Sequence, residues 1–141
     1  MFHLRAIEDV EGLEVVAVAD MDGGHMEEVR RKAGAERGYL DYLELLSDPD
    51  VDVVAVNTPP PFHEEMTLRG LKAGKHVLCE KPLAQSAEGC LHIGEVARAA
   101  GLNVLPVHNY FYTPCLESAE ALVRDGEIGD LQGLSSGSRT T

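Results

Sequence analysis

The chain has 141 residues, 44% of them hydrophobic and 26% charged, and a formal net charge of -12 at pH 7. This length suits one domain with a core of its own, and the composition is typical of a soluble, globular protein. The negative charge argues against nucleic acid and anionic membranes as partners, because their phosphates would be repelled.

Valine-rich runs and amphipathic stretches alternate along the chain. The valine-rich runs are almost continuously apolar, as in parallel strands that are covered on both faces. Several amphipathic stretches end at glycine, which favours the left-handed conformation that closes a helix. In chain order the sequence predicts strand 14–20, helices 25–34 and 41–46, strand 51–57, helix 62–73, strand 76–79, helix 86–100, strand 102–107 and helix 113–125.

This alternation is the signature of an α/β fold with right-handed crossovers, and it predicts a doubly wound parallel sheet. A last strand is expected over residues 130–134. The polar residues 135–141 are either a frayed end or the opening of a second domain.

Cysteine and histidine spacing gives no sign of a disulfide framework or a metal site. Cys79, Cys90 and Cys115 lie far apart without a CxxC pair, so we expect all three to be reduced and buried. The six histidines show neither HxxxH nor HExxH spacing. No apolar run approaches the ~18 residues of a membrane span and no signal peptide is visible, so a cytoplasmic protein is predicted.

Polar residues lie at the carboxyl ends of four of the predicted strands. In an open parallel sheet, ligands bind beyond the carboxyl ends of the strands, and all four groups would meet there. The pattern therefore predicts a ligand crevice at that edge of the sheet. The residues are Asp20, Asn57-Thr58, Glu80-Lys81 and His108-Asn109.

Several of these residues also have a purely structural interpretation. A carboxylate at Asp20 suits the ribose hydroxyls of a dinucleotide, but a solvated turn would use the same residue. The prolines at 59–61 stiffen a connector, and Thr58 is expected to cap the helix that follows them. A histidine such as His63, alone in the first turn of a helix, is more often structural than a ligand.

The tripeptide Glu80-Lys81-Pro82 ends an apolar strand abruptly. Proline favours an extended conformation at Lys81, and alternation along the chain then directs the side chains of Glu80 and Lys81 to opposite sides. A lysine at this edge can polarise or protonate a substrate oxygen. Taken alone, the tripeptide is more simply an exposed lysine before a turn.

The wider context of the tripeptide is more specific. The segment VVAVNTPPPFHEEMTLRGLKAGKHVLCEKPLAQS, residues 53–86, resembles the central signature of the Gfo/Idh/MocA oxidoreductase family. The flanking segments HLRAIEDVEGLEVVAVAD and YLDYLELLSDPDVDVVAV are similar to the same family's N-terminal domain in order and spacing. The resemblance covers essentially the whole chain.

The resemblance implies a Rossmann domain that binds NAD, with NADP less favoured, and a sugar or polyol as the substrate. It places Asp20 at the adenosine ribose and puts a second set of residues along the dinucleotide crevice. It makes Lys81 the catalytic lysine, beside nicotinamide and substrate, with Glu80 holding the nicotinamide half and Asn109 at the same mouth. The crevice residues are Asn57, Thr58, Pro59 and Pro60, with His63 close by.

The chain departs from the family pattern at both ends. The family begins with a strand and a G-x-G-x-x-G turn before the segment HLRAI, and it continues into a C-terminal α/β domain that supplies most of the substrate pocket. We therefore expect residues 1–130 to form a partial dinucleotide-binding Rossmann domain that lacks the first strand and the phosphate loop. Residues 131–141 would begin the substrate domain.

Two hypotheses follow for function. In the first, the chain is a fragment of an NAD-dependent dehydrogenase and is inactive alone. In the second, it is a non-catalytic module that binds a nucleotide or a partner. Under the first hypothesis, the partner is a small-molecule substrate, and neither nucleic acid nor a membrane is bound. A homo-oligomer is also possible under this hypothesis, because unpaired strand edges can pair with other chains.

Overall fold

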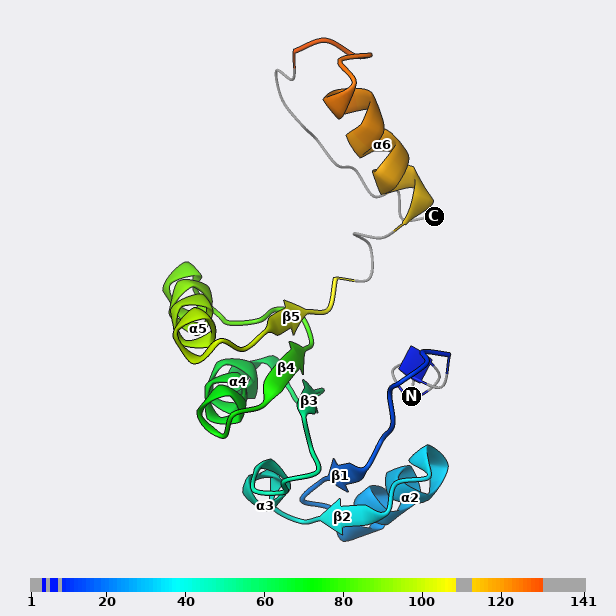
Figure 1. Cartoon of the computed structure of the whole chain (residues 1–141), viewed down its shortest axis with the longest axis vertical. Helices are drawn as coiled ribbons and strands as arrows, with labels where there is room; N and C mark the ends of the chain where they lie inside the picture. Colours follow the sequence, from blue (N-terminus) through cyan, green and yellow to red (C-terminus); the bar gives the residue numbers. More distant parts are fainter. Residues whose placement is uncertain (1–3, 5, 8, 109–112, 131–141) are drawn as a thin grey trace. The chain divides into compact units, whose positions relative to one another are not determined.

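The computed structural model describes residues 4, 6–7, 9–108 and 113–130. These residues divide into two compact units, one ending at Val107 and one beginning at His108. Strands and helices alternate along the chain (Figure 1). In chain order they are β1 (Ala17–Ala19), α2 (Gly23–Ala33), β2 (Arg37–Tyr39), α3 (Tyr42–Leu46), β3 (Val53–Val56), the 3-10 turn η1 (Pro60–Phe62), α4 (His63–Lys72), β4 (His76–Cys79), α5 (Ala87–Ala100), β5 (Val104–Pro106) and α6 (Pro114–Arg124).

The strands form two parallel sheets in the first unit. β1 pairs with β2, and β4 lies between β3 and β5. The parallel α/β fold predicted from the sequence is confirmed, because the paired strands are parallel and a helix separates each strand from the next. Strand β2 was not predicted, since its three residues, Arg37-Gly38-Tyr39, contain no apolar run.

Helix α2 packs directly on β2 at Gly38. A Cβ atom at this position would collide with the sulfur of Met26 on α2. Glycine is therefore the residue that lets the helix approach the strand backbone closely. This packing fixes the first sheet against its covering helix.

The main core lies between the three-stranded sheet and the helices α4 and α5, which lie on one side of it in Figure 1. Side chains alternate along each strand, so Val56, Val77 and Cys79 point into this core and are buried. The other face remains open, with Val53 50% and Leu105 55% exposed. In this three-stranded sheet, the described residues therefore cover one face only.

A buried polar cluster, which we call the Asp48 cluster, links the two sheets at the amino-terminal end of β3. Asp48 Oδ2 accepts a hydrogen bond from the Tyr39 hydroxyl at 3.0 Å, and Arg37 Nε lies 3.1 Å from the same oxygen. The ammonium of Lys75, just before β4, donates to the carbonyl oxygen of Asp48 at 2.8 Å. Residues of β2 and the residue that precedes β4 therefore both contact Asp48, in the loop between α3 and β3.

The Asp48 carboxylate is held in its charged form. The backbone N–H of Asp50 is the main cause that keeps the pKa of Asp48 below its usual value, and the Tyr39 hydroxyl and Arg37 act in the same direction. Burial opposes them. A carboxylate can stay charged in a protein interior when several hydrogen-bond donors surround it, as they do here.

Most predicted helix ends are confirmed. Ser86 accepts the hydrogen bond of the Gly89 N–H at 3.0 Å, and Gly34 and Gly101 close α2 and α5 in the left-handed conformation. The expected cap by Thr58 is wrong, because its hydroxyl lies 3.4 Å from the sulfur of Met66 instead. Pro59 begins the turn and lacks the side-chain donor or acceptor that a cap needs.

The cysteines differ from expectation. Cys79 is buried on β4, but Cys90 and Cys115 are exposed, so the prediction that all three are buried is wrong. Cys90 lies outside the stripe of buried residues on α5, and Cys115 lies on α6, which has no buried residue. All three are free thiols.

The second unit contributes α6, which begins with Thr113 as N-cap and Pro114 in its first turn. Leu116, Leu122 and Val123 on this helix are all more than 40% exposed. The expected strand over 130–134 and the expected domain start at 131–141 fall almost wholly outside the described residues.

Candidate functional site

A cavity of about 560 Å³ lies between β1 and β3. The two strands are not paired with each other, and within the described part of the chain each has a partner on one side only. Apolar side chains, among them those of residues 16–19 and 53–56, line most of the cavity. At the carboxyl ends of the same strands its lining changes to Asp20, Asn57 and Thr58. The cavity is therefore apolar along the strands and polar at the strand ends.

Asp20 ends β1 and presents a charged acceptor to this polar end. Its Oδ1 accepts the N–H of Asp22 at 2.9 Å, and its Oδ2 lies 2.7 Å from Nδ1 of His25. The backbone hydrogen bond from Asp22 is the larger cause that holds the pKa of Asp20 below its usual value, followed by the bond with His25. The side chain keeps 36% of its surface exposed, so a ligand can reach the carboxylate.

His25 reaches Asp20 because Asp22 starts helix α2 in the intervening turn. Asp22 Oδ1 accepts the N–H groups of Gly24 at 2.8 Å and of His25 at 3.0 Å, which fixes the first helical turn. His25 also lines the cavity. Sequence reasoning missed this residue. The only sequence signal for a role of His25 was Asp20, five positions earlier, at the edge of the sheet where a ligand was predicted.

The loop after β3 is tied to the loop after β4 through His63. The His63 side chain is fully buried, with 0% of its surface exposed. Its Nε2 lies 2.6 Å from the carbonyl oxygen of Thr58, and its Nδ1 lies 2.7 Å from that of Pro82. A carbonyl oxygen can only accept, so both contacts are hydrogen bonds when both ring nitrogens carry a proton.

Glu80 and Lys81 follow β4 immediately, next to the end of β3. The N–H of Glu80 donates to the carbonyl oxygen of Val56 at 3.0 Å, which sets the two strand ends side by side. The carboxylate of Glu80 accepts the backbone N–H of Lys81 at 3.1 Å. The Lys81 side chain is exposed, and the bond between Lys81 and Pro82 is cis.

The structure thus gathers most predicted site residues along the carboxyl edge of the strands. Asp20, Asn57 and Thr58 line the cavity, and the loop with Pro59 and Pro60 continues from it. His63 lies beneath that loop with its ring enclosed, so it can shape the crevice but offers no exposed atom to a ligand. Asn109 lies outside the described residues, and His108 follows β5 as the first residue of the second unit.

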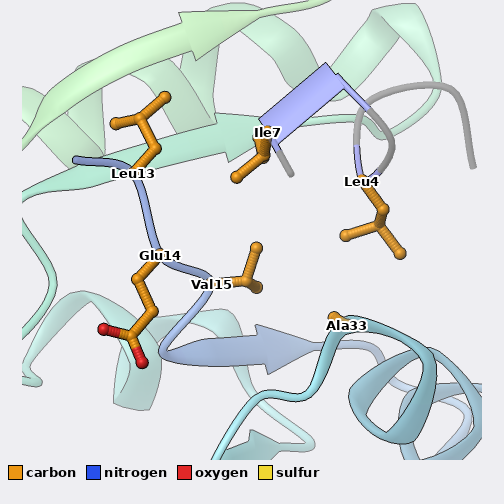
Figure 2. Close-up of a pocket in the computed structure, with 6 residues that line it drawn as sticks. All are labelled: Leu4, Ile7, Leu13, Glu14, Val15 and Ala33. Carbon is orange, nitrogen blue, oxygen red and sulfur yellow. The ribbon is translucent and has the colours of Figure 1, made fainter. Parts of the chain in front are cut away.

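Figure 2 shows a second, smaller pocket of about 180 Å³ near the beginning of the chain. Its lining is apolar apart from Glu14, and five of its six lining residues also line the larger cavity. None of the predicted site residues lies along it. The lining residues are Leu4, Ile7, Leu13, Glu14, Val15 and Ala33.

Two other features are absent from the described residues. No cluster of three or more histidine, cysteine or acidic side chains there has the arrangement of a metal site. None of the helices in that part of the chain has the length and apolarity to cross a membrane. The polar strand ends are therefore the strongest candidate for function.

Residues 1–108 match a family described as "Oxidoreductase family, NAD-binding Rossmann fold", Gfo/Idh/MocA. The chain is 38% identical over 129 residues to inositol 2-dehydrogenase from Acidothermus cellulolyticus, and the match covers 90% of this chain and 38% of that protein. It is 38% identical over 119 residues to trans-1,2-dihydrobenzene-1,2-diol dehydrogenase from Oryctolagus cuniculus, covering 84% of this chain and 36% of that protein. The chain thus spans little more than a third of these relatives.

A solved structure is similar over the same region. It is a 3-ketoreductase from Actinomadura kijaniata in complex with TDP-benzene and NADP. The TM-score is 0.81 at 32% sequence identity, and the match covers 90% of this chain and 40% of that one.

Proposed function

The chain belongs to the Gfo/Idh/MocA oxidoreductase family, whose NAD-binding Rossmann domain it matches over residues 1–108, and we propose that it is the dinucleotide-binding part of an NAD-dependent dehydrogenase. The substrate would be a sugar, a polyol or a related alcohol or carbonyl compound. This class is supported by the relatives, which are named for inositol and for a dihydrodiol.

One observation carries the proposal. Asp20, Asn57 and Thr58, which end two separate strands, line the polar end of a single cavity. This is the place where open α/β sheets bind nucleotides. These residues fit a dinucleotide, since a charged carboxylate can accept hydrogen bonds from a ribose diol and apolar walls suit the flat faces of the bases.

Asp20 would bind the adenosine ribose through its carboxylate. An anion there favours NAD, because the 2′-phosphate of NADP would meet a like charge. The chain has no arginine beside Asp20 in the turn Asp20-Met21-Asp22 to offset that repulsion. Asn57, Thr58 and the prolines 59 and 60 would line the middle of the crevice, held in place by His63 from below.

Glu80 and Lys81 would lie at the end of the site where the nicotinamide of the cofactor meets the substrate. The bound cofactor supplies a hydride acceptor, and the protein has to manage the proton of the substrate hydroxyl. Lys81 is exposed just after β4, where its neutral amine can take up that proton from the substrate oxygen during oxidation and its ammonium can return the proton during reduction. The carboxylate of Glu80 fixes the backbone of Lys81 and thereby the direction from which the ammonium approaches.

A fluorescence titration of the chain with NADH tests the proposal. Binding is expected for the wild type and should weaken in Asp20→Ala, which removes the ribose acceptor. The matched control is Glu95→Gln on α5, which removes one exposed negative charge outside the cavity lining and should bind like the wild type. Absence of binding, or equal binding by Asp20→Ala, would contradict the assignment.

A further inference from the structure

The carboxylate of Asp20 does not face a ligand alone. Nδ1 of His25 lies 2.7 Å from Asp20 Oδ2, and both side chains line the polar end of the cavity. The imidazole is 60% exposed, and its Nε2 makes no hydrogen bond to any other described residue. A ligand that engages Asp20 therefore meets this second nitrogen as well.

The charge of His25 is sensitive to its neighbours. The charged groups that act on it are Asp20 and Asp22 in the turn after β1 and Glu28 one turn along α2, all of them acidic. The hydrogen bond to Asp20 is the largest cause that raises the pKa of His25 above its usual value of 6.5. The imidazole, in contact with the predicted ribose acceptor, therefore gains its proton at a higher pH than an ordinary histidine does.

We propose that His25 is a specificity-determining residue, whose protonation sets how strongly the site rejects a ribose that carries a 2′-phosphate. The inference rests on the proposed function, because it requires Asp20 to face the adenosine ribose.

The two protonation states of His25 present different sites. With a neutral imidazole, the pair carries the full negative charge of Asp20, which repels a 2′-phosphate. With an imidazolium, the pair is neutral overall and Nε2–H becomes an exposed donor, which a phosphate oxygen can accept. Discrimination between NAD and NADP should therefore be strongest at alkaline pH and should relax as His25 gains its proton.

The experiment compares two probes that differ only at the 2′ position. Adenosine 5′-phosphate and adenosine 2′,5′-bisphosphate are titrated into the chain, followed by its amide resonances, at about pH 6 and about pH 9, on either side of histidine titration. The 2′-phosphate itself titrates near pH 6, so His25→Gln serves as the reference that keeps this contribution and removes that of the imidazole. His25→Arg carries a positive charge at both pH values.

The measured quantity is the affinity for the bisphosphate divided by the affinity for the monophosphate. When the pH is lowered from about 9 to about 6, this ratio should rise more in the wild type than in His25→Gln. The difference should be on the order of two- to fivefold, which is the effect of one solvent-exposed ion pair. His25→Arg should keep the higher ratio at both pH values. An equal change in wild type and His25→Gln would overturn the role of His25 and leave the ribose site at Asp20 standing. Failure of both probes to bind, or binding that leaves the Asp20 and Asp22 amides unchanged, would overturn the ribose site and this inference with it.

Discussion

Nδ1 of His63 lies 2.7 Å from the carbonyl oxygen of Pro82, nineteen residues further along the chain. Through this contact, and the one from Nε2 to Thr58, a single buried side chain joins the loop after β3 to the loop after β4. The first loop forms part of the proposed cofactor crevice and the second carries Lys81. The geometry of the two loops therefore depends on one imidazole.

Replacing His63 should cost stability. His63→Ala removes the hydrogen bonding of the imidazole to the carbonyl oxygens of Thr58 and Pro82 and opens a cavity at a fully buried position, so we expect the free energy of unfolding to fall by about 2–4 kcal/mol. Denaturant unfolding measures the change. His92→Ala, on the exposed side of α5, is the control and should change the free energy of unfolding by less than about 0.5 kcal/mol. A loss as small as that of the control would show that the two contacts contribute little.

Lys81 should affect turnover far more than cofactor binding. In an enzymatically active form of the protein, Lys81→Ala should lower kcat by roughly 10²–10⁴-fold, the usual contribution of a positioned acid or base. NADH affinity should change little, because the ammonium is proposed to act on the substrate. Lys81→Arg should not restore turnover, since a guanidinium does not release its proton.

Steady-state kinetics and a direct NADH titration separate the two effects. A Lys81→Ala variant with nearly normal kcat would refute the catalytic assignment. So would a variant whose turnover falls only because NADH no longer binds.

Asp20 should determine cofactor choice. Asp20→Ser removes the negative charge that faces the ribose, so the preference for NADH over NADPH should fall. Parallel titrations of wild type and variant with both cofactors measure the preference. Equal affinity of the wild type for NADH and NADPH at about pH 9, well above the ordinary histidine pKa, would contradict the assignment.

The Asp48 cluster should make stability depend on pH in the acidic range. The pKa of Asp48 is lower in the folded protein than its ordinary value of 3.8, so the unfolded chain binds the proton more readily. The stabilisation is therefore complete above that ordinary value and is lost as the pH falls through the lower, folded pKa. Unfolding curves at a series of acidic pH values should show less of this loss in Asp48→Asn than in the wild type. Asp52→Asn, an exposed carboxylate nearby, should behave like the wild type.

The open edges of β1 and β3 should favour self-association. Backbone N–H and C=O groups on the open edge belong to alternate residues, because Val16, Asp20, Asp52 and Val56 make the hydrogen bonds toward the neighbouring strands. The residues on the open edge are Ala17, Ala19, Val53 and Ala55. Size-exclusion chromatography should show species larger than a monomer, and these amides should exchange rapidly in the monomer. A single monomeric peak with slow exchange at all four amides would contradict this expectation.

The order of elements could be predicted from sequence because valine-rich runs and glycine-closed helices are local signals. The runs around Val54 and Val77 gave strands, and Ser86 and Gly101 gave the ends of α5. Strand β2 could not be predicted from the sequence, because Arg37-Gly38-Tyr39 is extended through pairing with β1 and packing against α2, and no local sequence pattern indicates these contacts.

The positions of Asp20, Asn57 and Lys81 at the strand ends were also predictable, since all parallel strands end at one edge. The partners of those residues were not. His25 meets Asp20 only because Asp22 fixes the turn between them, and His63 meets Pro82 across two loops. The Asp48 cluster likewise joins Tyr39 and Lys75 from separate strands. Such contacts depend on tertiary packing and carry no signature in the sequence.

A dinucleotide is proposed to bind at the carboxyl ends of β1, β3 and β4. Amide chemical shifts of the chain, followed during a titration with NADH, report on this binding residue by residue. Binding there should produce saturable changes at Asp20, Asn57, Thr58 and Lys81, with none at Asp48 and Lys75 on the opposite edge. Changes confined to the opposite edge, or no saturable change at any of these amides, would contradict it.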